Sequence, residues 1–169
     1  MASDIQPILV AACGNLMAGD DAFGPLVAHA LRAFAPPHLE VVDLGMKPAG
    51  LLDHLDDRRA LIIVDAAIAG PGFPEGSLVD IDFYSPVRPP LLHDAPLSSH
   101  GLSISHELEL AKRLGRLPQH VILVAAAAGD VTVGNPTSTA VANLVEPAVR
   151  RILGRTERLL DTSNEKTNA

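Results

Sequence analysis

Short, uninterrupted apolar runs alternate along this chain with segments whose apolar residues recur at helical spacing. The runs at 8–12, 60–64 and 121–125 contain no polar residue, as is typical of strands buried on both faces of a parallel sheet. Between them, apolar residues return every three or four positions, which predicts amphipathic helices. Strands that alternate with helices build an α/β domain. We therefore predict a three-layer sandwich, in which a twisted, mainly parallel sheet of about five strands has helices on both faces.

The bounds of the predicted elements follow from this periodicity and from the residues that interrupt it. We expect strands at 8–12, 40–44, 60–64, 76–83 and 121–125, and helices at 23–34, 48–57 and 103–114. A last helix is expected to begin at Asn135 and Pro136, which suit the N-cap and the first helical position. Residues 84–101 are rich in Pro, Ser and His and have no period, which predicts a functional or mobile loop. A single domain is expected over residues 1–153, followed by a flexible polar tail over 154–169.

The composition excludes several classes of protein. With 47% hydrophobic and 20% charged residues, the chain is too apolar for intrinsic disorder. Its net charge of −7 argues against nucleic acid or an anionic membrane as a partner. The one cysteine, Cys13, excludes an intrachain disulfide and a multi-cysteine metal site, and we expect it to be a small core residue. Because neither a basic signal-peptide region nor an apolar run of ~20 residues is present, the expected location is the cytoplasm.

Acidic residues and one histidine follow the predicted strands at the positions where ligands bind in open α/β sheets. Asp20 and Asp21 come after the first strand, Asp65 ends the third, and His100 lies in the long loop after the fourth. Ligands bind outside the carboxyl ends of strands where the strand order reverses. If the first strand lies between the second and third, these side chains meet there. Two carboxylates and an imidazole suit a divalent ion such as nickel, zinc or manganese and leave coordination positions for water or substrate.

Each of these residues also has a purely structural interpretation. Asp20 and Asp21 would favour the start of the first helix through its dipole, and Asp65 could cap a turn. His100 could be a solvated loop histidine, and His93 in the same loop is its main rival.

The sequence matches the motifs of other types of functional site less well. Gly14 and Gly19 are spaced as in a phosphate-binding loop, but the acidic pair that follows would repel phosphate. A dinucleotide fingerprint after the first strand and a nucleophile elbow are both absent. A phospho-receiver or other regulatory metal-binding module stays an alternative, although no Lys follows the strand at 121–128 as a receiver requires. A peptidase that holds its own zinc is a further alternative.

Three motifs occur in order at the ends of these strands. The first runs from Gly14-Asn15 to the acidic pair and ends at Gly24, the second is an apolar strand followed by Asp65-Ala66, and the third is Ser99-His100. Together with the loop at 133–136, they closely resemble the motifs of [NiFe]-hydrogenase maturation endopeptidases, over roughly residues 5–153. The fold expected from this resemblance is the same sandwich of about five strands.

The resemblance implies an activity and a partner. Members of this family are nickel-dependent endopeptidases that remove a short C-terminal extension from the hydrogenase large-subunit precursor after nickel insertion. Their nickel-contacting positions match Asp21, Asp65 and His100, which are therefore the expected metal ligands and catalytic residues. Nickel is expected to be presented by the substrate, and cadmium or zinc to substitute for it in vitro.

Three further residues are expected to support this site. Gly14, Asn15 and Asp20 would hold the ligands in place or position the substrate. A metal ion polarises a peptide carbonyl and activates water, with a carboxylate as general base. Which of the two carboxylates takes that role is left open by the sequence.

Overall fold

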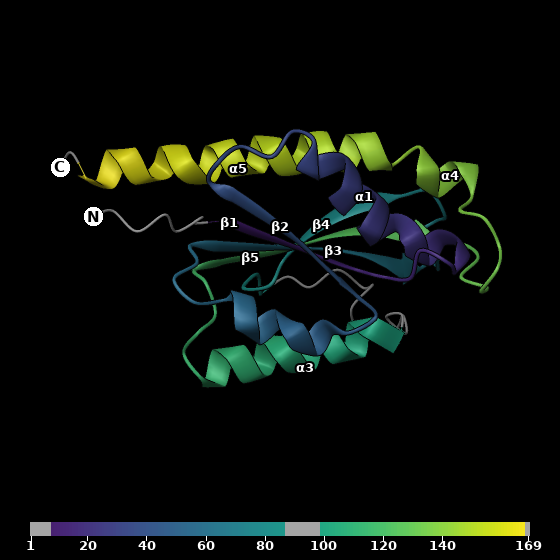
Figure 1. Ribbon diagram of the computed structural model, residues 1–169, viewed down its shortest axis with the longest axis horizontal. Helices are drawn as coiled ribbons and strands as arrows, with labels where there is room; N and C mark the ends of the chain where they lie inside the picture. The colour runs from purple at the N-terminus through teal and green to yellow at the C-terminus, as the bar shows by residue number, and fades with distance from the viewer. Residues whose placement is uncertain (1–7, 87–98, 168–169) are drawn as a thin grey trace.

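The computed structural model describes residues 8–86 and 99–167, and for residues 99–103 and 162–167 it describes the backbone alone. Strands and helices alternate along the chain (Figure 1). The strands are β1 (Ile8–Cys13), β2 (Leu39–Gly45), β3 (Ala60–Ile68), β4 (Leu78–Asp82) and β5 (His120–Ala128). The helices are α1 (Phe23–Arg32), α3 (Ser99–Arg113), α4 (Thr139–Ala142) and α5 (Val145–Thr167), with short 3-10 helices η1 (Gly19–Ala22) and η2 (Pro48–His54).

The five strands form one sheet in the order β2-β1-β3-β5-β4. β1, β2, β3 and β5 are parallel, and β4 pairs antiparallel with β5 at the edge. The predicted α/β class is confirmed, and β1 lies between β2 and β3, which is the arrangement under which the acidic residues were expected to meet. The chain leaves β1 for β2 on one side and returns to β3 on the other, so the strand order reverses at the carboxyl ends of β1 and β3.

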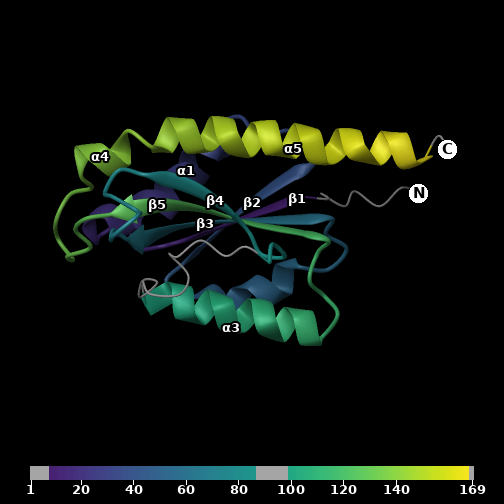
Figure 2. The same cartoon turned by 180° about the vertical axis from the view of Figure 1, so that it is seen from behind.

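Helices cover both faces of this sheet (Figures 1 and 2). α1 and α5 lie over one face, and η2 and α3 lie over the other. Side chains of β1 alternate between the two, since Val10 packs on the α1 and α5 side and Leu9 and Ala11 pack on the other. All six residues of β1 are buried, which explains why the strand is apolar without interruption.

The last helical region differs from the sequence prediction. The first helix there, α4, is capped by Ser138, whose hydroxyl accepts a hydrogen bond from the Val141 N–H. Asn135, the predicted cap, instead donates its side-chain amide to Asp130. The helical conformation is interrupted by a turn at Asn143 and Leu144 before α5 begins. The predicted start was wrong because Ser138 is also a favourable cap, and local composition does not decide between the two.

α5 continues well beyond the end of its strongest apolar stripe. The residues after Gly154, predicted to be a polar tail, continue the helix to Thr167. Thr156 is buried there, and its hydroxyl donates to the Ile152 carbonyl oxygen. None of the helices in residues 8–86 and 99–167 has the length and apolar character needed to cross a membrane.

α3 begins at Ser99, earlier than the predicted start at residue 103. The prediction that His100 belongs to a loop was therefore wrong, because its backbone lies in the first turn of this helix. Residues 99–101 add no apolar residue to the stripe of the helix, so periodicity could not extend it there.

Candidate active site

The loop between β1 and α1 lies at the carboxyl end of β1 and packs against β3 at Val64. Gly14 has a φ of +138°, and a Cβ there would lie 2.1 Å from the Asp21 carbonyl oxygen. A Cβ on Gly24 would lie 2.0 Å from the Cys13 carbonyl oxygen and 2.8 Å from that of Val64. Side chains at positions 14 and 24 would therefore clash with backbone. The glycines of the first motif let the acidic pair between them approach both strands.

Asn15 shapes the start of this loop. Its side-chain Oδ1 accepts a hydrogen bond from the Met17 N–H at 2.9 Å, and its own N–H donates to the Asp21 carbonyl oxygen at 3.1 Å. These two hydrogen bonds of Asn15 stabilise the turn that leads to Asp21.

Asp20 is fully buried and joins the loop to the connection after β5. Its Oδ2 accepts from the N–H groups of Gly129 at 2.9 Å and Asp130 at 3.2 Å, and its Oδ1 accepts from the Ser138 N–H at 2.8 Å. Burial acts to raise the pKa of Asp20, but the hydrogen bonds from Ser138, Gly129 and Asp130 outweigh it and lower the pKa below its ordinary value. The carboxylate is therefore ionised and links segments more than one hundred residues apart.

Asp21 and Asp65 reach the same edge from different elements. Asp21 lies in η1 and is 5% exposed. Asp65 lies in β3, one residue beyond Val64, and is also 5% exposed. The prediction that Asp65 ends this strand was wrong, because β3 continues through alanines to Ile68. Asp65 Oδ1 accepts from the Ala66 N–H at 2.8 Å. Two carboxylates thus stand nearly out of solvent at the point where the strand order reverses.

The pKa of the Cys13 thiol is affected by the negative charges at this edge of the sheet. Burial raises its pKa strongly, and the carboxylates of Asp65, Asp43 and Asp21 raise it further. Cys13 is fully buried and packs in the core under η2 and α3. It is the small core residue that the sequence predicts, and it stays a neutral thiol between acidic groups.

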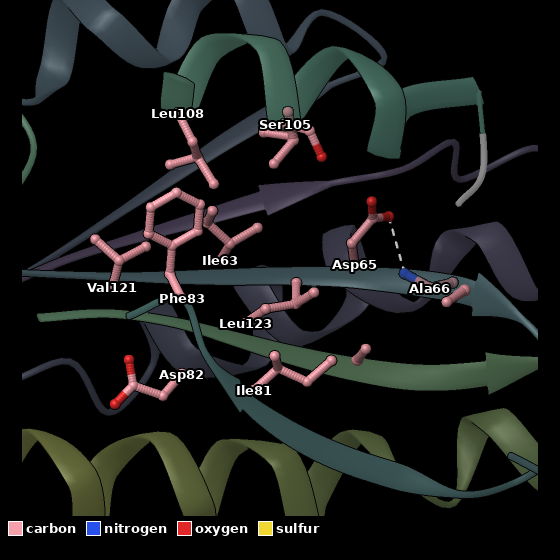
Figure 3. A pocket seen from close by; sticks show the side chains of 13 residues that line it. Ile63, Asp65, Ala66, Ile81, Asp82, Phe83, Ser105, Leu108, Val121 and Leu123 are labelled. Atoms are coloured by element: carbon pink, nitrogen blue, oxygen red, sulfur yellow. Dashed lines mark hydrogen bonds between the residues drawn. The ribbon is translucent and has the colours of Figure 1, made fainter. Parts of the chain in front are cut away.

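A cavity of about 120 Å³ adjoins Asp65 on the α3 side of the sheet. Figure 3 shows Asp65 and Ser105 at one end of it and Leu108, Phe83 and Val121 at the other. Its walls are formed by β3, β4, β5 and α3, and its remaining lining is almost entirely apolar. The Asp82 carboxylate points away from the cavity, toward α5.

The third predicted ligand, His100, lies in the first turn of α3, and its side chain falls outside the described part of the structure. His93, its rival, also lies outside the described residues. Among residues 8–86 and 99–167, no three His, Cys, Asp or Glu side chains that the structure describes are grouped to hold a metal ion. The structure therefore brings Asp21 and Asp65 to one edge and leaves the predicted histidine contact as a prediction.

The sequence interpretation missed the residues that anchor the loop from the far side. Asp130 accepts hydrogen bonds from the Thr132 N–H and from the Asn135 side chain, which hold its pKa below the ordinary value. The N–H of Gly19 donates to the Asn135 carbonyl oxygen at 3.1 Å. An aspartate followed two residues later by threonine is a local turn signal. The contact between this turn and the first loop could not be predicted, because residue spacing does not show it.

Comparisons with known proteins place this geometry in a family. The family model described as hydrogenase maturation protease matches residues 25–155. The chain is 27% identical over 148 residues to the hydrogenase 2 maturation protease of Escherichia coli K12, covering 86% of this chain and 88% of that protein. It is 29% identical over 126 residues to the hydrogenase expression/formation protein HupD of Thiocapsa roseopersicina, covering 73% of this chain and 55% of that protein.

Solved structures show the same similarity. The hydrogenase maturating endopeptidase HybD from E. coli superimposes with a TM-score of 0.78 at 25% identity, covering 89% of this chain and 92% of that one. A hydrogenase 2 maturation peptidase from a Thaumarchaeota archaeon gives a TM-score of 0.64 at 27% identity, covering 88% and 97%. The sheet and its helices are thus those of hydrogenase maturation endopeptidases.

Proposed function

The chain belongs to the hydrogenase maturation protease family, and we propose that it removes the C-terminal extension of a [NiFe]-hydrogenase large-subunit precursor once nickel has been inserted. Its activity class is that of an endopeptidase, as in its structural relatives. The observation that carries the finer proposal is the pair of nearly buried carboxylates, Asp21 and Asp65, at the point of strand reversal. The cytoplasm is the proposed compartment, and cell fractionation would test it.

The donor chemistry of the edge suits a cation delivered by the substrate. Two carboxylates gathered in a weakly solvated place repel each other unless a positive charge or a proton compensates them. Asp21 and Asp65 supply oxygen ligands, and His100 would add an imidazole nitrogen, a set that fits a borderline divalent ion such as nickel. In the proposed reaction nickel belongs to the substrate, and its arrival would relieve the repulsion between the acids.

The residues have separate tasks in such a reaction. Nickel supplies Lewis acidity that polarises a nearby peptide carbonyl. One of the two carboxylates takes a proton from the attacking water, and Asp21 and Asp65 are both candidates for that role. Gly14 and Asn15 hold the loop that carries Asp21, and Asp20 fixes the other side of that loop to residues 129–138. Because these contacts form within the protein, the acids are positioned before substrate binds.

The alternative given above, a regulatory module without protease activity, does not agree with a chain that belongs to a protease family. A peptidase with its own tightly held zinc differs from the proposal in where the metal resides. Elemental analysis of the purified protein separates the two, because the proposal expects less than stoichiometric metal when substrate is absent.

The test is a processing assay with the full-length protein and an unprocessed large-subunit precursor, prepared with and without nickel. We expect release of a C-terminal peptide from the nickel-loaded precursor alone, detected by mass spectrometry. Asp21→Asn and Asp65→Asn are expected to abolish release, and His100→Ala to do the same. Asp53→Asn is the matched control, since Asp53 is exposed in η2 and does not line the cavity beside Asp65.

Two results would overturn the proposal. One is unchanged processing by Asp21→Asn or Asp65→Asn at wild-type levels of folded protein. The other is equal release from nickel-loaded and nickel-free precursors, which would show that the metal is not read.

A further inference from the structure

The cavity beside Asp65 has a floor built from ordered rows of side chains. Strand register pairs Ile63 with Leu123 and Leu123 with Ile81, so these three form a middle row across β3, β5 and β4. Val121 lies two residues before Leu123 and shares its face. Phe83 follows β4 and donates its N–H to the Val121 carbonyl oxygen, which places both at the end of the cavity away from Asp65 (Figure 3).

The row that contains Asp65 is different because its central member is small. Register pairs Asp65 with Ala125, and Ala125 with Val79 on the antiparallel edge strand. Ala125 carries only a methyl group where the neighbouring row has Leu123, and Ala66 and Ala67 line the same end. The space next to the carboxylate therefore exists because β3 and β5 carry alanines there.

Ser105 of α3, which lines the cavity beside Asp65, is exposed, whereas Asp65 and Ala125 at the same end are buried. At the other end Phe83 is half-buried and Asp82 is exposed. The cavity therefore lies close to the protein surface at both ends.

We propose that this cavity is a specificity pocket for an apolar, branched aliphatic side chain of the substrate, at a residue flanking the peptide bond that is cut. The inference rests on the proposed function, since it takes Asp65 as part of the cleavage site. The pocket lies against that carboxylate, so a peptide whose backbone meets Asp65 has a neighbouring side chain within reach of the cavity. Ala125 and Leu123 are the residues that set its size.

The size and lining of the cavity argue for an aliphatic side chain in particular. A dry cavity of roughly 150 Å³ lined by Leu, Ile and Phe holds a benzene molecule. This cavity, at about 120 Å³, is smaller and suits a Val, Ile or Leu side chain better than a phenyl ring. A charged side chain would lose its hydration among the apolar side chains of Ile63, Leu123 and Phe83.

The test varies the substrate and the pocket together. Nickel-loaded precursors carry Ala, Val, Leu or Phe at each residue flanking the scissile bond, and pairs of them compete for the full-length enzyme. Wild type is expected to prefer Val or Leu over Ala by about tenfold or more at one flanking position, since each added methylene in an apolar pocket gives that order of discrimination. Ala125→Leu is expected to reverse the preference toward Ala, and Leu123→Ala to admit Phe.

Two controls keep the experiment decisive. Ala126→Val adds bulk on the same strand but toward the α1 and α5 side of the sheet, so the competition ratio is expected to stay at its wild-type value. Ratios measured in competition do not depend on how much enzyme is folded, and circular dichroism confirms the fold of each variant. If Ala125→Leu does not fold, Ala125→Val gives the same reversal in smaller measure.

The outcomes separate the pocket from the proposed function. A wild-type enzyme that cleaves no nickel-loaded precursor refutes the proposed function, and this inference with it. An enzyme that cleaves, but shows no size preference at either flanking position, refutes the pocket alone. A preference that Ala125→Leu and Leu123→Ala leave unchanged also refutes it, because the selection would then arise elsewhere.

Discussion

Two buried aspartates at the same edge of the sheet have opposite surroundings. Asp20 is 0% exposed and accepts hydrogen bonds from three backbone N–H groups of the connection after β5. Asp65 is 5% exposed, accepts from the adjacent Ala66 N–H, and lines a cavity of about 120 Å³. Burial alone therefore does not mark a catalytic acid. The partners differ instead: those of Asp20 come from a segment more than one hundred residues away, whereas Asp65 accepts from the next residue and borders a cavity.

The largest effect expected from this contrast is on activity. Asp65→Asn should lower the rate of precursor cleavage by about 10³-fold, because an amide cannot serve as a general base or as an anionic ligand. Its Oδ1 can still accept from the Ala66 N–H, so thermal unfolding should change little. Rates come from single-turnover processing assays. Activity within a few-fold of wild type would place Asp65 with Asp20 as a structural group.

The close approach of the first loop to the strands is expected to show in stability. In Gly24→Ala the new Cβ meets the carbonyl oxygens of Cys13 and Val64, and overpacking of this kind costs about 3 kcal/mol. Gly70→Ala is the matched control, since a Cβ at that exposed glycine meets nothing within 4 Å. Urea unfolding measures both variants, and equal stability would show that the loop can lift from the strands.

Asp20→Asn should destabilise the protein by about 2 kcal/mol at pH 7, the order expected for hydrogen bonds to a buried charge. Because folding lowers the pKa of Asp20, its contribution is present above the ordinary value of 3.8 and is lost as the pH falls through the lower folded value. The difference between wild type and Asp20→Asn should therefore narrow when urea unfolding is repeated near pH 3.

Asp130→Asn is the comparison for that experiment. The carboxylate of Asp130 is exposed and binds only nearby residues of its own turn, so its loss should cost less than the loss of Asp20. If Asp130→Asn lowered the free energy of unfolding more than Asp20→Asn, the turn around Asp130 would contribute more to stability than the bridge from Asp20.

The smallest expected effect is at the helix that follows the anchored turn. Ser138→Ala removes the hydroxyl that accepts from the Val141 N–H, and loss of such a cap costs about 1 kcal/mol. The substitution also removes the side-chain hydrogen bond from Ser138 to Asp20, but the Ser138 N–H still donates to Asp20, so cleavage should change little. A thermal melt and the processing assay together check this, and a loss of cleavage would tie the cap to the site.

Sequence alone predicted the parts of this protein that depend on local pattern. The cores of β1, β3 and β5 were visible as apolar runs, and Asp65 was identified because a carboxylate directly after such a run must lie at the edge of the core. The bridge from Asp20 was not predictable, because its partners are mostly backbone N–H groups that any residue carries. The cavity was equally hidden, since it depends on Ala125 lying beside Asp65 across two strands.

The bond between Asp20 and the connection after β5 has a consequence for synthesis of the protein. Loop closure over more than one hundred residues is slow and comes late in folding, and a chain emerging from the ribosome exposes its N-terminal part first. The edge that carries the acids cannot be completed until the segment around Ser138 has been made. A fragment ending at Ala128 lacks every residue that donates to Asp20, so its first loop should stay unanchored.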